Sequence, residues 1–162
     1  MHGPRRQRVP VQVHSAEIEI GPTRKKLAHA RGTPCAVVLK RAYVPPSPDD
    51  GMRVLVDRLW PRGLGKEQLA VDFWLKDAAP SDALRRWYGH KPGRWKSFAE
   101  KYRAELRDKT DLLRLLDELR CRGRVTLLYG ARDTARNNAV VLREVLIARR
   151  GAGKRARGKV VE

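Results

Sequence analysis

The sequence contains few cysteines and no long apolar run. Only Cys35 and Cys121 occur among 162 residues, which excludes a disulfide scaffold and favours a reducing compartment. No apolar stretch approaches the roughly 20 residues that cross a bilayer. The arginines near the N-terminus are not followed by the apolar segment of a secretory signal. These absences predict a cytoplasmic protein with no membrane partner.

Familiar metal-binding and catalytic motifs are also missing. Three of the four histidines lie in the first 34 residues, and neither cysteine has a second ligand at metal-binding spacing. Gly63-Leu64-Gly65-Lys66 lacks the first glycine and the final hydroxyl residue of a Walker loop. No Gly-x-Ser-x-Gly elbow occurs either. We therefore predict no metal and no cofactor, and the sequence leaves the question of enzymatic activity open.

Acidic residues are scarce relative to basic ones. The chain has 36 Lys+Arg and 18 Asp+Glu, a net charge of +18. Residues 1–34 and 149–162 each contribute +5, and residues 35–148 contribute +8. A basic protein attracts polyanions whatever its function. We therefore expect non-specific association with nucleic acid, because no zinc-finger, RNP or basic-zipper motif indicates specific recognition.

Composition divides the chain into three regions. Residues 1–34 mix Arg, Gly, Pro and His without a sustained period, which predicts a disordered basic leader. Within it, residues 12–20 alternate like a strand, but Gly21-Pro22 closes the run and nothing nearby pairs with it. Residues 35–148 are predicted to form one α/β domain. Residues 149–162, rich in Gly, Ala, Lys and Arg, are predicted to be a basic flexible tail.

The domain alternates between short apolar runs and helical patterns. Strands are predicted at residues 36–43, 52–57 and 125–129. Residues 66–109 are helical in character, with one helix from Ser81 to Tyr88. A further helix is predicted with Thr110 as its N-cap, and the last one from about Ala135 to Ala148. This order predicts a single small α/β domain with a short, mainly parallel sheet flanked by helices.

Polar residues follow two of the predicted strands and suggest a site. Because parallel strands end at one sheet edge, where ligands bind in open α/β folds, the two loops should converge there. Arginines of the first loop would hold an anion through bidentate hydrogen bonds, next to the N–H groups of the last helix. The predicted catalytic residues are Asp57, His90 and Asp133, and the predicted ligand-binding residues are Arg58, Trp60, Arg62, Tyr129, Arg132, Asn137 and Asn138. The alternative is that the carboxylates only pair with the arginines and tie the loops together.

Two motifs are too unusual to be generic, namely residues 53–63 and residues 125–133 followed by 138–142. With Trp74-Leu75-Lys76, Ala79-Pro80-Ser81 and residues 87–90, they resemble the YeaO-like branch of the domain-of-unknown-function family 488, over about residues 36–147. The resemblance implies a small cytosolic bacterial α/β protein and no particular activity. Members of the wider family carry a Cys-His-Arg-like triplet where this chain has Asn137-Asn138-Ala139, so the resemblance implies no thiol chemistry here.

Two functions are therefore compared. In the first, the protein binds a small anionic ligand, phosphate- or nucleotide-like, at the sheet edge, with or without chemistry on it. In the second, it is a nucleic-acid-associated accessory protein that binds through its basic core and tails. An interaction module without chemistry remains if both fail. The sequence does not indicate an oligomeric state.

Overall fold

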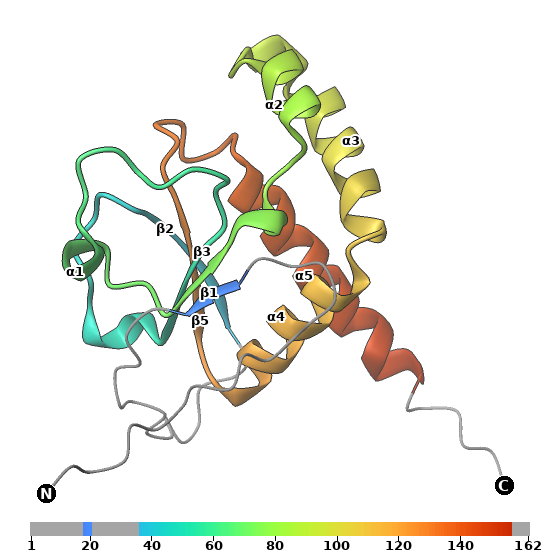
Figure 1. Cartoon of the computed structure of the whole chain (residues 1–162). Coiled ribbons are helices and arrows are strands. Elements are labelled where there is room, and N and C mark those ends of the chain that lie inside the picture. The colour runs from blue at the N-terminus through green and yellow to red at the C-terminus, as the bar shows by residue number, and fades with distance from the viewer. Residues whose placement is uncertain (1–17, 21–35, 157–162) are drawn as a thin grey trace, which may run out of the picture.

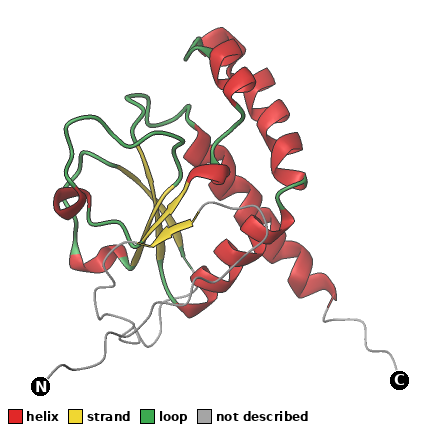
Figure 2. Ribbon diagram, viewed as in Figure 1, coloured by secondary structure: helices red, strands yellow, loops and turns green. Residues whose placement is uncertain are grey.

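The computed structural model describes residues 18–20 and 36–156, which form a five-stranded sheet with helices (Figures 1 and 2). The strand order in the sheet is β1-β4-β3-β5-β2. The four strands β2, β5, β3 and β4 are parallel, and β1 pairs antiparallel with β4. The strands are β1 (Ile18–Ile20), β2 (Val37–Arg41), β3 (Met52–Leu55), β4 (Phe73–Leu75) and β5 (Val125–Tyr129). This confirms the predicted α/β fold with a mainly parallel sheet.

The helices follow capping signals in the sequence. Ser81 accepts a hydrogen bond from the Leu84 N–H at 3.2 Å and so begins α2, which ends at Gly89. The α-helices are α1 (Lys66–Leu69), α2 (Asp82–Tyr88), α3 (Trp95–Arg107), α4 (Thr110–Arg122) and α5 (Asn138–Ala156). Short 3₁₀ helices are η1 (Pro48–Asp50), η2 (Lys76–Ala78) and η3 (Pro92–Arg94). No helix in the described ranges is long and apolar enough to cross a membrane.

The two faces of the sheet are covered differently. The long helices α3, α4 and α5 gather on one side, and α1 lies on the other (Figure 1). Tyr102, Leu116 and Leu142 are fully buried in the larger core, together with side chains of β3 and β5. On the opposite face, Leu55 and Leu128 pack under the segment 57–72, which contains α1. Each fully buried leucine contributes about 1.5–3 kcal/mol of hydrophobic stabilisation.

Two strands were not predicted. Phe73–Leu75 falls in the segment interpreted as helical, yet it forms β4 and pairs with β3. Ile18–Ile20 falls in the predicted leader, yet it pairs with β4 in register Ile18 to Leu75. Strand β4 has only three residues, which is too short to show an alternating pattern. Strand β1 is the end of the alternating run 12–20, for which the sequence offered no pairing partner. The other leader residues, 1–17 and 21–35, lie outside the described residues.

The bounds of two helices also differ from the prediction. Helix α4 begins at Thr110 with Lys109 as the N-cap residue, not with Thr110 as the cap. Helix α5 begins at Asn138, three residues later than predicted, and continues to Ala156 through most of the predicted tail. Ala, Lys and Arg are good helix formers, so two isolated glycines at about 1 kcal/mol each do not end the helix. Residues 157–162 lie outside the described residues.

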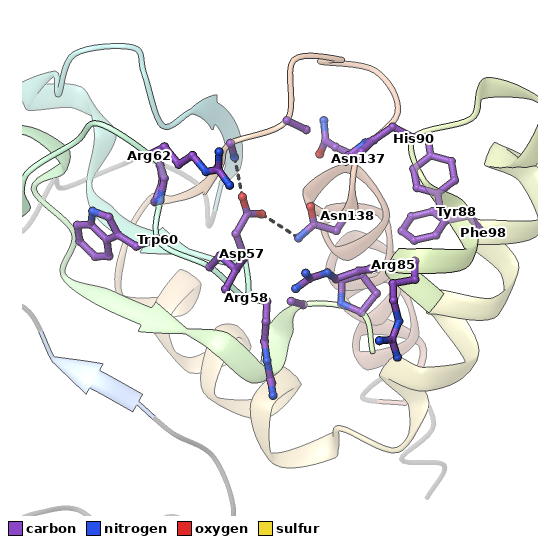
Figure 3. Close-up of a pocket in the computed structure, with 17 residues that line it drawn as sticks. Asp57, Arg58, Trp60, Arg62, Arg85, Tyr88, His90, Phe98, Asn137 and Asn138 are labelled. Atoms are coloured by element: carbon purple, nitrogen blue, oxygen red, sulfur yellow. Dashed lines mark hydrogen bonds between the residues drawn. The ribbon is translucent and has the colours of Figure 1, made fainter. Parts of the chain in front are cut away.

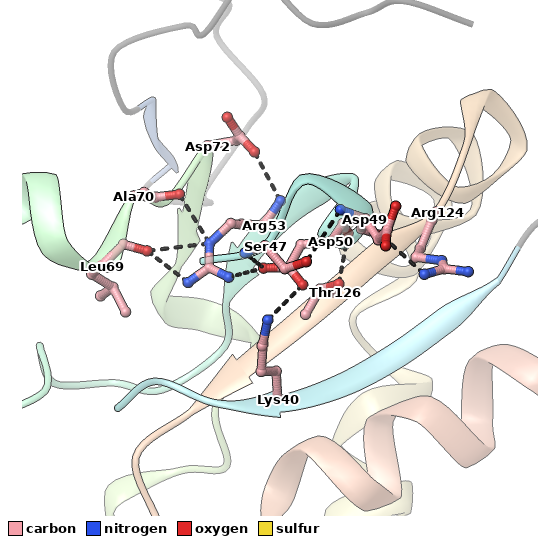
Figure 4. A network of polar contacts seen from close by, with 10 residues as sticks. All are labelled: Lys40, Ser47, Asp49, Asp50, Arg53, Leu69, Ala70, Asp72, Arg124 and Thr126. Atoms are coloured by element: carbon pink, nitrogen blue, oxygen red, sulfur yellow. Dashed lines mark hydrogen bonds and ion pairs between the residues drawn. The ribbon is translucent and has the colours of Figure 1, made fainter. Parts of the chain in front are cut away.

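A buried ionic network lies near the amino ends of β3 and β5 (Figure 4). Asp50 accepts hydrogen bonds from Lys40 Nζ at 2.7 Å, from the Ser47 N–H at 2.9 Å and from the Arg53 guanidinium. Arg53 also donates to the backbone oxygens of Leu69 and Ala70 at the end of α1. The network therefore joins β2, β3 and α1, and it lies at the sheet edge opposite the candidate site.

Candidate functional site

A pocket of about 520 Å³ lies at the carboxyl edge of the sheet. Its lining comes from the loop after β3, the loop after β5, the start of α5, and the α2–α3 region that covers it (Figure 3). This is the edge where the sequence placed the site. A volume of this size is typical of small-molecule sites.

Asp57 is fixed on the floor of the pocket. Its Oδ2 accepts a hydrogen bond from the Gly130 N–H at 2.7 Å, and its Oδ1 accepts one from Asn138 Nδ2 at 3.3 Å. A Cβ at position 130 would stand 3.2 Å from that Oδ2, so glycine permits the close approach. The Asp57 backbone oxygen accepts from the Trp74 indole N–H at 2.8 Å. One carboxylate therefore joins the ends of β3 and β5 to the start of α5.

Burial raises the pKa of the Asp57 carboxyl above its ordinary value of 3.8. The hydrogen bonds from Gly130 and Asn138, and the charges of Arg85 and His90, act in the opposite direction but are outweighed. Because the folded pKa lies above the unfolded one, ionisation of Asp57 disfavours the folded state. This penalty is absent well below pH 3.8 and grows as the pH rises through the higher, folded pKa.

We therefore predict a pH-dependent effect of Asp57→Asn. The asparagine cannot ionise, so the free energy of unfolding of the variant, minus that of the wild type, should increase between pH 4 and pH 7. Urea denaturation at several pH values measures this difference. Asp108→Asn, which removes one exposed carboxylate, is the matched control and should change the free energy of unfolding at pH 7 by less than about 0.5 kcal/mol. A pH-independent difference for Asp57→Asn would contradict the assignment.

The two asparagines at the start of α5 hold the backbone in place. Asn137 is the N-cap, because its Oδ1 accepts from the Val140 N–H at 3.1 Å. Asn138 Nδ2 donates to the Val56 oxygen at 2.9 Å as well as to Asp57. Both side chains line the pocket. The Asn137 Oδ1 and the Asn138 Nδ2 are therefore already hydrogen-bonded within the protein, where they fix the start of α5.

Four arginines surround this single carboxylate. Arg58 and Arg62 come from the loop after β3, and Arg85 and Arg86 come from α2. Arg58 pairs with Asp77 at 3.3 Å, and Arg85 pairs with Asp82 at 3.6 Å. Among the described residues, no carboxylate is within ion-pair distance of Arg62 or Arg86. The pocket therefore has a positive rim with cations available to a ligand.

Aromatic side chains form the wall beneath α2 and α3. Tyr88 and Phe98 line the pocket, and their rings stack with centroids 4.3 Å apart. The His90 ring lies 5.6 Å from the Tyr88 ring and also lines the pocket. His90 has a φ of 54°, a left-handed conformation that costs a residue with a side chain about 1–2 kcal/mol. The wall is thus partly apolar, with one imidazole held at its end.

The pocket contains seven of the ten residues that were predicted for the site. The structure places Asp57, Arg58, Trp60, Arg62, His90, Asn137 and Asn138 in its lining. It does not place Tyr129, Arg132 or Asp133 there. Tyr129 is 3% exposed and packs in the larger core. Arg132 is exposed beyond the turn that follows β5.

Asp133 has a local structural role. Its Oδ1 accepts from the N–H groups of Ala135 and Arg136 at 2.9 and 3.0 Å, which shapes the turn before α5. These hydrogen bonds, together with the nearby Arg136 charge, hold the pKa of Asp133 below its ordinary value. Asp133 therefore shapes its own turn, and its ion pair is with Arg136 at 3.6 Å rather than with one of the arginines named in the alternative interpretation.

Trp60 is largely committed to packing, although it lines the pocket. Its indole N–H donates to the Leu64 oxygen at 2.7 Å, and its ring meets Trp74 edge-on with centroids 5.3 Å apart.

Arg85 and Arg86 line the pocket but were not predicted for the site. The one feature of the sequence that points to Arg85 and Arg86 is their position beside the Trp87-Tyr88-Gly89-His90 motif. No short-range sequence pattern predicts that α2 packs over the edge of the sheet.

The pocket presents guanidinium groups rather than a set of metal ligands. No group of three His, Cys, Asp or Glu side chains that could hold a metal occurs in the described part of the chain. Planar guanidinium groups bind carboxylate and phosphate oxygens in pairs. The Asp57 carboxylate, deep in the pocket, would instead accept from an N–H or O–H group of the same ligand.

Residues 36–159 match the family model described as the inactive DUF488-N3 subclade. The chain is 45% identical over 113 residues to the uncharacterised protein Rv3073c of Mycobacterium tuberculosis, covering 70% of this chain and 95% of that protein. It is 41% identical over 107 residues to the uncharacterised protein YeaO of Escherichia coli, covering 66% and 93%. No solved structure matches.

Proposed function

This chain belongs to the DUF488 family, in its inactive N3 subclade, and from this premise we propose that its pocket binds a small anionic ligand without transforming it. The observation that carries the proposal is the positive rim. Arg62 and Arg86 line the pocket, and no described carboxylate neutralises them. A phosphate or carboxylate group would supply the missing partner.

Apart from His90, whose imidazole lines the pocket, the residues that could act chemically are held in structural roles. Asn137 caps α5, and Asn138 bonds to β3 and to Asp57. Asp57 itself accepts from Gly130 and Asn138. No thiol or hydroxyl side chain lines the pocket apart from the Tyr88 phenol, which donates to the Arg136 oxygen. These contacts support a binding site rather than a nucleophilic one, and the cytoplasm is the compartment we propose for it.

Thermal-shift measurements on the full chain test the proposal. The ligands would be inorganic phosphate, ribose 5-phosphate and the nucleoside monophosphates. A ligand at about 100 times its Kd stabilises the protein by roughly 2.7 kcal/mol. Arg62→Ala removes a charged hydrogen-bond donor, which contributes about 1.5–3 kcal/mol, so most of the shift should disappear.

Arg114→Ala is the matched control, because Arg114 is an exposed arginine on α4 that does not line the pocket. It should keep the full ligand-induced shift. Equal shifts in wild type and Arg62→Ala, or an equal loss in both variants, would contradict binding at the rim. Recovery of a chemically altered ligand after incubation would show instead that the site is catalytic.

A further inference from the structure

The pocket continues into an unusually basic part of the surface. Helices α2 and α3 stand together beyond the sheet (Figure 1), and we call residues 82–101 the arm. Residues 85–99 of the arm contain five basic residues and no acidic one. Arg85, Arg86 and His90 belong to both the arm and the pocket. The arm therefore borders the positive rim of the pocket.

The cations of the arm, apart from Arg85, which pairs with Asp82, have no carboxylate partner among the described residues. Two arginines outside residues 82–101 do have carboxylate partners, since Arg103 pairs with Glu144 and Arg149 pairs with Asp117. Within the described residues, no carboxylate lies within ion-pair distance of Lys91, Lys96 or Lys101. All three lysines are exposed. Unpaired like charges on one short arm repel one another, and a polyanion would relieve this.

The arm also presents an aromatic ring among these charges. Trp87 is 37% exposed, whereas the neighbouring Tyr88 is 5% exposed. The Arg94 guanidinium lies 5.2 Å from the centre of the indole, and the Lys101 ammonium lies 5.5 Å from it. An exposed indole beside guanidinium and ammonium groups is the composition of sites that stack unpaired bases and hold their phosphates.

We propose that the arm and the pocket together bind single-stranded nucleic acid, with one phosphate at the rim of the pocket and the next ones along the arm. This inference rests on the proposed function, because it takes the arginines of the rim as the site of one phosphate. A strand accounts for both features that a small anion leaves unused, namely the unpaired lysines and the exposed indole. The bases of a single strand offer flat faces on which the Trp87 indole can stack. In a duplex these faces are already stacked on neighbouring base pairs.

The test compares a fluorescent 12-nucleotide single strand with a mononucleotide on the full chain. The arm variant is Lys91→Gln with Lys96→Gln and Lys101→Gln. It spares Arg94, which bonds to the Trp87 oxygen. The control variant is Arg107→Gln with Arg114→Gln and Arg122→Gln, which removes the same charge from exposed positions on α3 and α4. Both variants should keep the wild-type melting temperature.

We expect the 12-mer to bind more tightly than the mononucleotide and to bind less tightly as salt increases. For single strands the slope of log K against log salt is about −0.7 for each phosphate contact, so the arm variant should make it less steep by about 2. The control variant should change the slope much less. Trp87→Ala should weaken 12-mer binding at least about fivefold, and Trp87→Phe, which keeps a ring, should restore most of it.

Each failure has a distinct meaning. If mononucleotides and phosphate give no shift at all, the proposed function fails. If they bind but the 12-mer is no tighter, only the strand inference fails. If the arm and control variants lose the same affinity for the 12-mer, the strand inference is overturned, because the net charge of the protein would then account for the binding. Tighter binding of a duplex, or of anionic phosphatidylserine vesicles, would show that the arm recognises a different partner.

Discussion

Asp50→Asn is expected to lower the free energy of unfolding by about 3–5 kcal/mol at neutral pH, the usual loss when one member of a buried ion pair is removed. The Asp50 residue is 8% exposed and Arg53 is 4% exposed. Asparagine keeps the size of the side chain but leaves Lys40 and Arg53 facing each other without an anion. Urea denaturation at pH 7 measures the loss.

The effect of this substitution should diminish in acid. Burial alone would raise the pKa of Asp50, but the hydrogen bonds from Lys40, Ser47 and Arg53 outweigh it and hold the pKa below 3.8. A lowered folded pKa means that the stabilisation is present above the unfolded value and is lost as the pH falls through the folded one. The gap between wild type and Asp50→Asn should therefore narrow below pH 3.8.

Asp49→Asn is the matched control, since Asp49 precedes Asp50 directly and is exposed. It should change the free energy of unfolding by less than about 0.5 kcal/mol, as surface substitutions usually do. A similar loss in both variants would mean that η1, rather than the buried charge, is the source of stability. A loss at Asp50 that does not vary with pH would contradict the role of the ionised carboxylate.

Gly51→Ala is expected to destabilise the protein by about 3 kcal/mol or more. Gly51 has φ 65° and ψ −133°, a region that side chains disfavour by about 1–3 kcal/mol. A Cβ there would also stand 2.2 Å from the Arg124 carbonyl oxygen. That oxygen accepts the Met52 N–H at 2.9 Å at the start of β3. The backbone must shift there, so both strain and a lost strand contact contribute.

Gly63→Ala separates the cost of backbone strain from the cost of a steric clash. Gly63 also has a positive φ, 78°, but a Cβ there would meet nothing within 4 Å. Only the conformational cost of about 1–2 kcal/mol applies. Thermal and urea unfolding of both variants should therefore show a clearly larger loss at position 51. Equal losses would mean that the strands relax around a methyl group and that the close approach is not a constraint.

The parts of the fold that the sequence predicted are those with local signals. The five residues of β5 are all buried, and an uninterrupted apolar run of this kind is typical of a central parallel strand. Ser81 and Gly89 mark both ends of α2. In contrast, β1 and β4 depend on each other and on β3 for pairing. Strand β4 is too short for a periodic pattern, and the alternating run that ends in β1 does not identify its partner, so the pairing of both strands comes from tertiary contacts.

The position of the candidate pocket follows from the parallel sheet, and that part could be predicted from the sequence. Asp57 and Asn138 are 81 residues apart in the chain and meet at 3.3 Å, as expected for loops at one edge. Asp133 was assigned to the pocket because it follows β5, but its hydrogen bonds to the next turn direct it elsewhere. Arg85 and Arg86 come from a helix whose placement over the edge depends on its packing against α3. No short-range pattern encodes that packing.

The position of β5 has a consequence for the order of folding. It is the last strand in the described sequence, yet it lies between β2 and β3, with which it pairs in parallel. A nascent chain on the ribosome therefore holds β2 and β3 before the strand that joins them exists. The sheet can close only after residue 129 has left the exit tunnel, and until then the edges of both strands are open to chaperones or to wrong partners.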